Sequence, residues 1–124
     1  MTVFVFGNPD LKMDSLPLRL LPELRRRLPA TEFLVKDPNE EWDVPEELTI
    51  IDTVVGIAGP RLFPTLNDFA AAPRLTMHDF DAFANLRLLQ KIGRLKSVRI
   101  IGLPPHFEEA TAADFIENSL RPKA

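Results

Sequence analysis

The sequence predicts an α/β protein: a three-layer α/β/α sandwich with a mostly parallel, twisted sheet of about five strands and helices on both faces. Two observations predict this fold. Short apolar segments alternate with longer segments of helical periodicity, an order typical of parallel sheets. These short segments are apolar at nearly every position, which indicates strands that are buried on both faces. The length of 124 residues suits one domain over residues 1–124, because domains most often contain about 100–150 residues.

Three strands and one helix are expected in the first half of the chain. The strands are short, apolar and rich in β-branched or aromatic residues, and they cover residues 2–6, 31–35 and 48–52. Leucines recur at helical spacing over residues 14–28, where Pro22 should bend the helix or thin its first turns. The acidic segment 37–45 is expected to be a loop.

An edge strand, a further strand and two helices are expected in the second half. Residues 61–66 and 73–77 are the candidate segments for the edge strand, whose direction can be antiparallel. The other elements are a helix, a strand and a helix over residues 79–94, 97–101 and 111–120. The first of these helices has a broad apolar face that includes Phe83, Leu86, Leu89 and Ile92. Thr111 and Asp114 resemble a capping box at the start of the last helix.

Composition excludes several kinds of site and partner. The chain has no cysteine, which excludes disulfides, thiolate zinc sites, iron–sulfur ligation and a cysteine nucleophile. Fifteen Lys and Arg against eighteen Asp and Glu give a net charge of −3, the opposite of a nucleic-acid footprint, so we expect no nucleic-acid partner. No apolar segment approaches the roughly 20 residues that span a bilayer. No basic segment precedes the first strand, so we expect no membrane contact and a cytoplasmic location.

Three side chains that can carry chemistry are expected at one edge of the sheet. Asp14 lies just beyond the first strand, Asp52 ends the third, and His78 directly precedes a helix. Ligands of parallel sheets bind beyond the carboxyl ends of the strands. A histidine with two carboxylates can bind a divalent transition metal and leave positions open. Each residue also has a structural alternative: Asp14 as a helix N-cap, Asp52 as the cap of a neighbouring turn, and His78 as a surface residue.

Four short motifs occur in order along the chain. They are Gly7-Asn8 with Asp14 six residues after the Asn, the apolar segment ending in Asp52, Thr76-Met77-His78 before a leucine-rich helix, and Ile101-Gly102 followed by Pro104. In order and spacing, these motifs resemble the maturation endopeptidases of nickel–iron hydrogenases, over roughly residues 2–105.

The resemblance implies a metal-dependent, aspartyl-type endopeptidase that removes the C-terminal peptide from a nickel-loaded hydrogenase large-subunit precursor. The metal-contacting and catalytic residues of the family would map onto Asp14, Asp52 and His78, with Gly7 and Asn8 binding substrate. The nickel would arrive with the precursor. A metal held there can polarise the scissile carbonyl or lower the pKa of a bound water.

Two departures from the family pattern keep other functions open. Met13 replaces the first member of an acidic pair, and Pro17 replaces a glycine three residues after the metal-contacting acid. Both favour a non-catalytic paralogue that binds the large-subunit tail without cutting it. A small-molecule enzyme or nucleotide binder that shares only the fold is a third possibility, although the chain lacks a glycine-rich phosphate loop.

Four other features have mainly structural interpretations. Asn8 either orients a ligand or stabilises the turn before Pro9. Trp42 either contacts a partner or covers the core. His106 either lines the candidate site or, as expected, lies in an exposed loop. Residues 25–27, three arginines, are expected on a solvated helix face.

Overall fold

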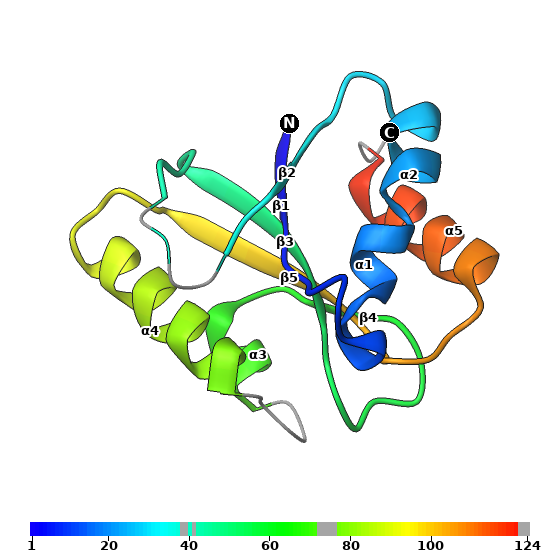
Figure 1. The fold of residues 1–124 in the computed structure, drawn as a ribbon. Coiled ribbons are helices and arrows are strands. Elements are labelled where there is room, and N and C mark those ends of the chain that lie inside the picture. Colours follow the sequence, from blue (N-terminus) through cyan, green and yellow to red (C-terminus); the bar gives the residue numbers. More distant parts are fainter. Residues whose placement is uncertain (38–39, 41, 72–76, 122–124) are drawn as a thin grey trace.

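The computed structural model describes residues 1–37, 40, 42–71 and 77–121, without the side chains of residues 77–82. Figure 1 shows the elements along the chain. They are β1 (Thr2–Val5), η1 (Lys12–Asp14), α1 (Leu16–Arg19), α2 (Leu21–Arg27), β2 (Glu32–Val35), β3 (Glu47–Thr53), β4 (Arg61–Phe63), α3 (Leu66–Ala70), α4 (Met77–Lys91), β5 (Ser97–Leu103) and α5 (Glu109–Leu120). None of the helices in the described residues is long and apolar enough to cross a membrane.

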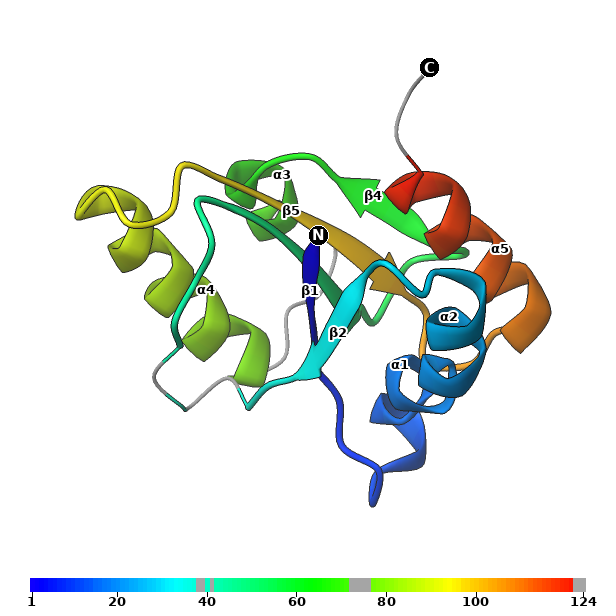
Figure 2. The ribbon, with the colours of Figure 1, turned by 90° about the horizontal axis from the view of Figure 1, so that it is seen from above.

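The predicted sheet and layers are confirmed. Five strands lie in the order β2-β1-β3-β5-β4, and all neighbouring pairs are parallel except β4 with β5. Strand β3 pairs with β5 along its whole length, from Glu47 opposite Ser97 to Thr53 opposite Leu103. Two views show α1, α2 and α5 on one face of the sheet and α3 and α4 on the other (Figures 1 and 2).

The sheet divides the core into two clusters because successive side chains of a strand point to opposite faces. Phe4 and Ile50 pack in the cluster beneath α3 and α4. Val5 and Ile51, their neighbours in the chain, pack in the cluster beneath α1, α2 and α5. Burying one such side chain contributes about 1.5–3 kcal/mol. The continuous apolar character of the strands is therefore explained by two cores that share one sheet.

The helix expected over residues 14–28 is interrupted. It consists of the short turn η1 followed by α1 and α2, which meet at Leu20. Pro22 lies in the first turn of α2, where its missing N–H is not needed for an intrahelical bond. The chain thus breaks just before the proline, where the sequence predicts a bend.

The segment after β3 departs most from prediction. β4 is an antiparallel edge strand as one option allowed, but residues 66–70 form helix α3 instead of continuing it. The hydroxyl of Thr65 caps this helix by accepting a hydrogen bond from the backbone N–H of Asp68 (3.1 Å). Residues 73–76 of the second candidate segment lie outside the described residues, and its last residue, Met77, begins helix α4 instead of ending a strand.

Two helix ends were also predicted wrongly. α4 ends at Lys91, so Ile92 lies beyond it and is 57% exposed instead of contributing to the apolar face. α5 begins at Glu109, so the capping box predicted at Thr111 is wrong. The Thr111 hydroxyl donates to the carboxylate of Glu108, the residue before the helix (2.8 Å).

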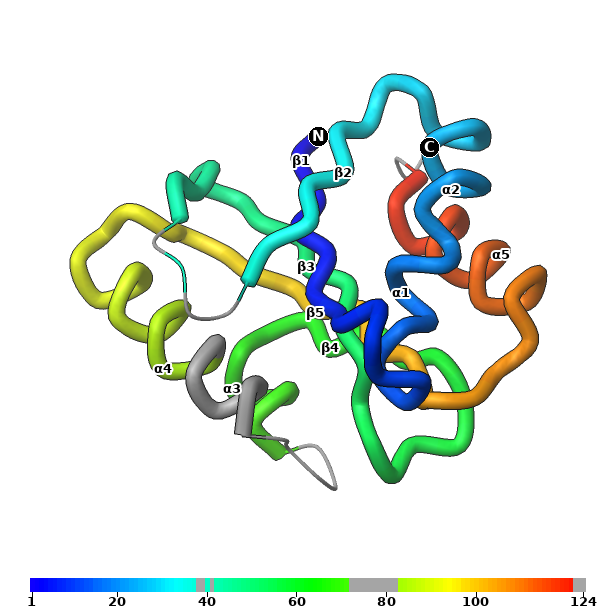
Figure 3. The backbone as a smooth tube through the Cα atoms, in the orientation of Figure 1, coloured from blue at the N-terminus to red at the C-terminus, as the bar shows by residue number. Residues whose placement is uncertain are grey.

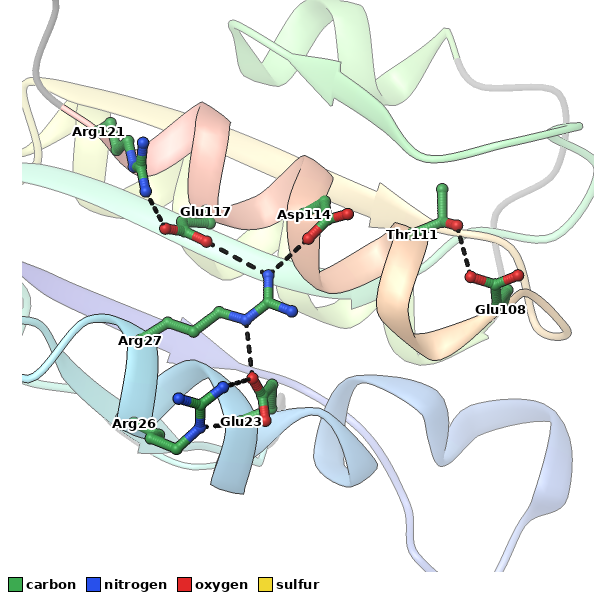
Figure 4. A network of polar contacts seen from close by, with 8 residues as sticks. All are labelled: Glu23, Arg26, Arg27, Glu108, Thr111, Asp114, Glu117 and Arg121. Carbon is green, nitrogen blue, oxygen red and sulfur yellow. Dashed lines mark hydrogen bonds and ion pairs between the residues drawn. The ribbon is translucent and has the colours of Figure 1, made fainter.

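Arg27 joins α2 to α5 through a network of ion pairs (Figure 4). Its guanidinium contacts Asp114 (2.6 Å) and Glu117 (3.3 Å) on α5, and Glu23 (2.8 Å) on its own helix. Arg26 also pairs with Glu23, and Arg121 pairs with Glu117. The Arg27 side chain is only 20% exposed, so the solvated-face interpretation is wrong for this residue.

Stability should depend on pH through Glu23. Hydrogen bonds donated by Arg26 and Arg27 lower the pKa of Glu23 from 4.5 to about 2. A carboxyl group whose pKa is lowered by folding stabilises the folded state above its unfolded pKa, and this contribution is lost as the pH falls through the folded pKa. The urea midpoint of the wild type should therefore exceed that of Glu23→Gln at pH 6, and the difference should shrink between about pH 4.5 and 2.

The difference is expected to be small because the Glu23 side chain is 39% exposed and solvent screens surface pairs. Glu32→Gln is the control, since Glu32 is exposed and has no cationic partner among the residues that the structure describes. A constant difference between wild type and Glu23→Gln across this pH range would contradict the assignment.

Candidate functional site

The candidate residues Gly7 and Asp52 lie side by side at the carboxyl edge of the sheet. Asp52 lies near the end of β3, opposite Gly102 of β5. Directly after β1, the backbone N–H of Phe6 donates to the carbonyl of Ile51 (2.9 Å). This bond extends the pairing of β1 with β3 and places Gly7 next to the end of the central strand.

A close backbone contact brings Asp14 back to the same edge. The N–H of Asn8 donates to the carbonyl of Asp14 (2.8 Å). A Cβ atom on Gly7 would lie 2.9 Å from that carbonyl oxygen and 3.0 Å from Cγ of Leu18. Only glycine therefore fits beneath the turn, which Figure 3 shows in blue between β1 and α1.

The turn gives Asn8 a structural role. Its side-chain oxygen accepts a hydrogen bond from the N–H of Asp10 (2.9 Å), which is the side-chain turn that asparagine favours. The turn-stabilising interpretation of Asn8 is therefore supported, and its role as a substrate contact stays a prediction.

Asp14 does not cap helix α1. The residue that precedes α1 is Ser15, and its side chain makes no capping bond. The Ser15 hydroxyl instead donates a hydrogen bond to the carbonyl of Lys12 and accepts one from Nε of Arg19. Each bond is 3.2 Å long. Ser15, and not Asp14, is therefore the N-cap residue of α1. Asp14 is half-buried, and its role as a metal contact stays a prediction.

Asp52 is buried, with 7% of its surface exposed. Its Oδ1 atom accepts a hydrogen bond from the N–H of Thr53, the next residue of β3 (2.8 Å). This bond lies within the strand, so the turn-capping alternative stays a prediction. A carboxylate has about four acceptor positions, so this bond is compatible with a second role as a metal ligand.

His78 lies in the first turn of α4, but its side chain is outside the described part of the structure. Because α4 leads into β5, a parallel strand, the helix must run back across the sheet and begin near the carboxyl edge (Figure 1). Among the described residues, no three His, Cys, Asp or Glu side chains gather as they would around a metal. The grouping of Asp14, Asp52 and His78 thus stays a prediction.

Thr53 is a residue that the sequence analysis missed. Its side chain is 5% exposed, and its hydroxyl has no hydrogen-bond partner in the described part of the chain. An unpaired buried hydroxyl costs free energy, so native structures keep few of them. The available signal was a polar residue directly after Asp52 in an otherwise apolar strand.

The remaining loop residues differ in role. Trp42 is 6% exposed, and its ring lies 5.4 Å from that of Phe6 and 6.0 Å from that of Phe4. It covers the core, as one of its two interpretations held. His106 is exposed, as expected.

A hollow of about 680 Å³ lies at the opposite edge, where the strands begin. It is lined by residues such as Thr2, Glu47 and Ser97. No predicted site residue lines this hollow, so it is separate from the candidate site.

Comparison with known proteins identifies the fold. No family model and no curated protein matches the sequence. Among solved structures, the hydrogenase-maturating endopeptidase HybD from E. coli is similar, with a TM-score of 0.65, 19% identity, and coverage of 97% of this chain and 90% of that one. An endopeptidase from Escherichia coli matches with a TM-score of 0.60, 18% identity, and 97% and 90% coverage. A hydrogenase 3 maturation protease matches with a TM-score of 0.65, 17% identity, and 97% and 88% coverage.

The chain therefore has the fold of the hydrogenase maturation endopeptidases, over nearly its whole length. The predicted resemblance is confirmed at the level of the fold.

The contact beneath the Asp14 turn can be tested with two glycines. Gly7→Ala should lower the free energy of unfolding by about 1–3 kcal/mol, because the added methyl group meets backbone that must shift. Gly59→Ala is the control: its Cβ would meet only Cε1 of Phe107, at 3.9 Å, so a change within about 0.5 kcal/mol is expected. Urea unfolding followed by circular dichroism measures both, and equal effects would refute the close contact.

Two buried threonines of β3 offer a second test. Thr53→Val removes an unpaired hydroxyl and should leave stability unchanged or raise it by about 1 kcal/mol. Thr49→Val should lower stability by about 1.5–3 kcal/mol, because the Thr49 hydroxyl accepts a hydrogen bond from the charged Arg99 (2.9 Å). A large loss of stability in Thr53→Val would show that its hydroxyl has a partner.

Proposed function

We propose that this protein is an endopeptidase that removes the C-terminal peptide from a nickel-loaded hydrogenase large-subunit precursor. The observation that carries the proposal is the shared fold: two neighbours that align with 97% of the chain are named as hydrogenase maturation proteases. Fold alone does not determine function, so the proposal also depends on the residues at the carboxyl edge.

The local geometry supports the proposal at two of the three positions. Asp52 lies near the end of β3 and Asp14 lies beyond the end of the neighbouring β1, and the contacts of Gly7 and Phe6 hold their backbones at one edge. In the proposed reaction, these carboxylates and His78 contact the nickel that the precursor carries, and so orient the scissile bond. A divalent metal there polarises the carbonyl or makes a bound water more acidic. Gly7 and Asn8 would lie along the substrate.

A non-catalytic paralogue is the alternative, and Met13 favours it. Met13 takes the place of an acidic residue in the family pattern, and its side chain is 54% exposed beside Asp14. Pro17 is less informative, because it lies in the first turn of α1, where proline is readily accommodated. Such a paralogue would bind the large-subunit tail without cutting it. In either case we propose a cytoplasmic location.

Cleavage of the precursor tests the proposal. Purified protein is mixed with nickel-loaded precursor, and the released C-terminal peptide is measured by mass spectrometry. Asp14→Asn, Asp52→Asn and His78→Ala should each lower the rate by about 100-fold or more, since a metal contact contributes several kcal/mol to the transition state.

Asp43→Asn is the matched control, because Asp43 is an exposed carboxylate in the loop before β3, and it should cleave at the wild-type rate. Full activity of His78→Ala would overturn the proposed site. Precursor binding by the wild type without peptide release would establish the non-catalytic alternative.

A further inference from the structure

The second half of α4 and the segment that follows it are unusually basic for this protein. Residues 82–107 contain no Asp or Glu, although the whole chain has a net charge of −3. The cations of this segment are Arg87, Lys91, Arg94, Lys96 and Arg99. The acidic balance of the chain therefore hides a local basic region.

Two large aliphatic side chains lie exposed within this region. Leu88 is 56% exposed and Ile92 is 57% exposed. Leu88 lies on α4 and Ile92 directly follows the helix, where its N–H donates to the carbonyl of Leu88 (3.1 Å). The two exposed side chains therefore lie at the C-terminal end of α4, whereas Leu86 and Leu89 face the core. We define the α4 patch as this aliphatic pair and its basic neighbours: Arg87, Leu88, Lys91, Ile92 and Arg94.

The cations of the α4 patch are not neutralised by carboxylates in the described part of the chain. Lys91 and Arg94 form no ion pair there. Arg87 donates to the side-chain oxygen of Asn67 (2.7 Å) and lies over the ring of Phe83 at 5.0 Å. Both of these partners of Arg87 are uncharged, so they hold the side chain in place without neutralising its positive charge. This differs from α2, where Arg27 contacts three carboxylates.

A hollow of about 220 Å³ adjoins the α4 patch. Arg87 and Lys96 contribute cationic groups to its lining, and Asn67 and Gln90 contribute amides. Lys96 also pairs with Glu46, but both side chains are about two-thirds exposed, at 68% and 70%, and such pairs contribute little. Arginine presents a planar fork that matches a carboxylate. The hollow is suited to a carboxylate. It shares Arg87 with the α4 patch, whereas Leu88 and Ile92 do not line it.

We propose that the α4 patch docks an acidic segment of a partner protein that carries an aliphatic side chain. The aliphatic side chain packs between Leu88 and Ile92, and a carboxylate enters the hollow beside Arg87. Charge complementarity and the aliphatic pair favour a protein partner over a nucleic acid, because the phosphate backbone of a nucleic acid would place charges against Leu88 and Ile92.

This docking surface is separate from the proposed cleavage site. α4 has 15 residues and is therefore about 22 Å long. The α4 patch lies toward its C-terminal end, whereas His78 lies in its first turn. The inference goes beyond the proposed function because it does not depend on Asp14, Asp52 or His78.

An NMR titration of the isotopically labelled protein tests the inference. The probe is a helical peptide made of glutamate and leucine, and the comparison peptide has glutamine in place of each glutamate. Chemical shifts should change around residues 84–96 with the acidic peptide, and binding of the glutamine peptide should be at least about fivefold weaker.

Two pairs of variants make the test specific. Lys91→Ala with Arg94→Ala should weaken binding of the acidic peptide about fivefold, as expected for the loss of two rim cations. Arg26→Ala with Arg121→Ala removes the same charge from α2 and from the residue after α5, and should change affinity less than twofold. Leu88→Ala with Ile92→Ala should weaken binding without changing its dependence on salt.

Several results would overturn the inference: no shift changes, shift changes away from the α4 patch, or equal losses in the two charge-removing pairs. Tighter binding to duplex DNA or to vesicles of anionic phospholipid would assign the α4 patch to another class of partner. None of these measurements uses cleavage, so failure of the proposed peptidase activity would be recognised separately.

Discussion

Burial of β3 on both faces is the constraint on which the rest of the structure depends. Six of its seven residues are buried, and it lies between β1 and β5 in the sheet. A parallel strand in this position must be covered by helices on both sides. This requirement places α1, α2 and α5 on one face and α3 and α4 on the other. It also fixes the carboxyl edge, where Asp52 lies one residue before the end of β3 and Gly7 lies just beyond β1.

Charge is distributed differently over the two helical layers. On one face, Arg27 of α2 pairs with two carboxylates of α5 and holds the two helices together. On the other face, the cations of the α4 patch have no carboxylate partner among the described residues. The total charge of −3 averages these two layers and describes neither. The net charge of the whole chain is therefore a weaker guide to its partners than the charge of one face.

The sequence predicted the strands and the carboxyl edge of the sheet because short, continuously apolar segments of a small protein are best buried as central strands. It placed Asp52 at the carboxyl edge because the end of an apolar strand is visible in the sequence, although β3 continues for one residue beyond it. It did not predict why Asp14 lies nearby, since that depends on the hydrogen bond from the N–H of Asn8 to the carbonyl of Asp14 and on the space that Gly7 leaves for it. Helix α3 was missed because it has only five residues, too few for a periodic pattern. The unpaired hydroxyl of Thr53 was invisible because a missing partner can be recognised only in three dimensions.

The position of Trp42 gives the molecule an internal optical reporter. Trp42 is the single tryptophan of a chain that has no tyrosine, so its emission is the only strong intrinsic fluorescence. The indole packs against Phe4 and Phe6, and its N–H donates to the carbonyl of Asp37 (2.9 Å). Its emission maximum therefore reports water entry at β1, on the α3 and α4 face of the sheet. Quenching by acrylamide can follow that face alone while the layer formed by α1, α2 and α5 stays optically silent.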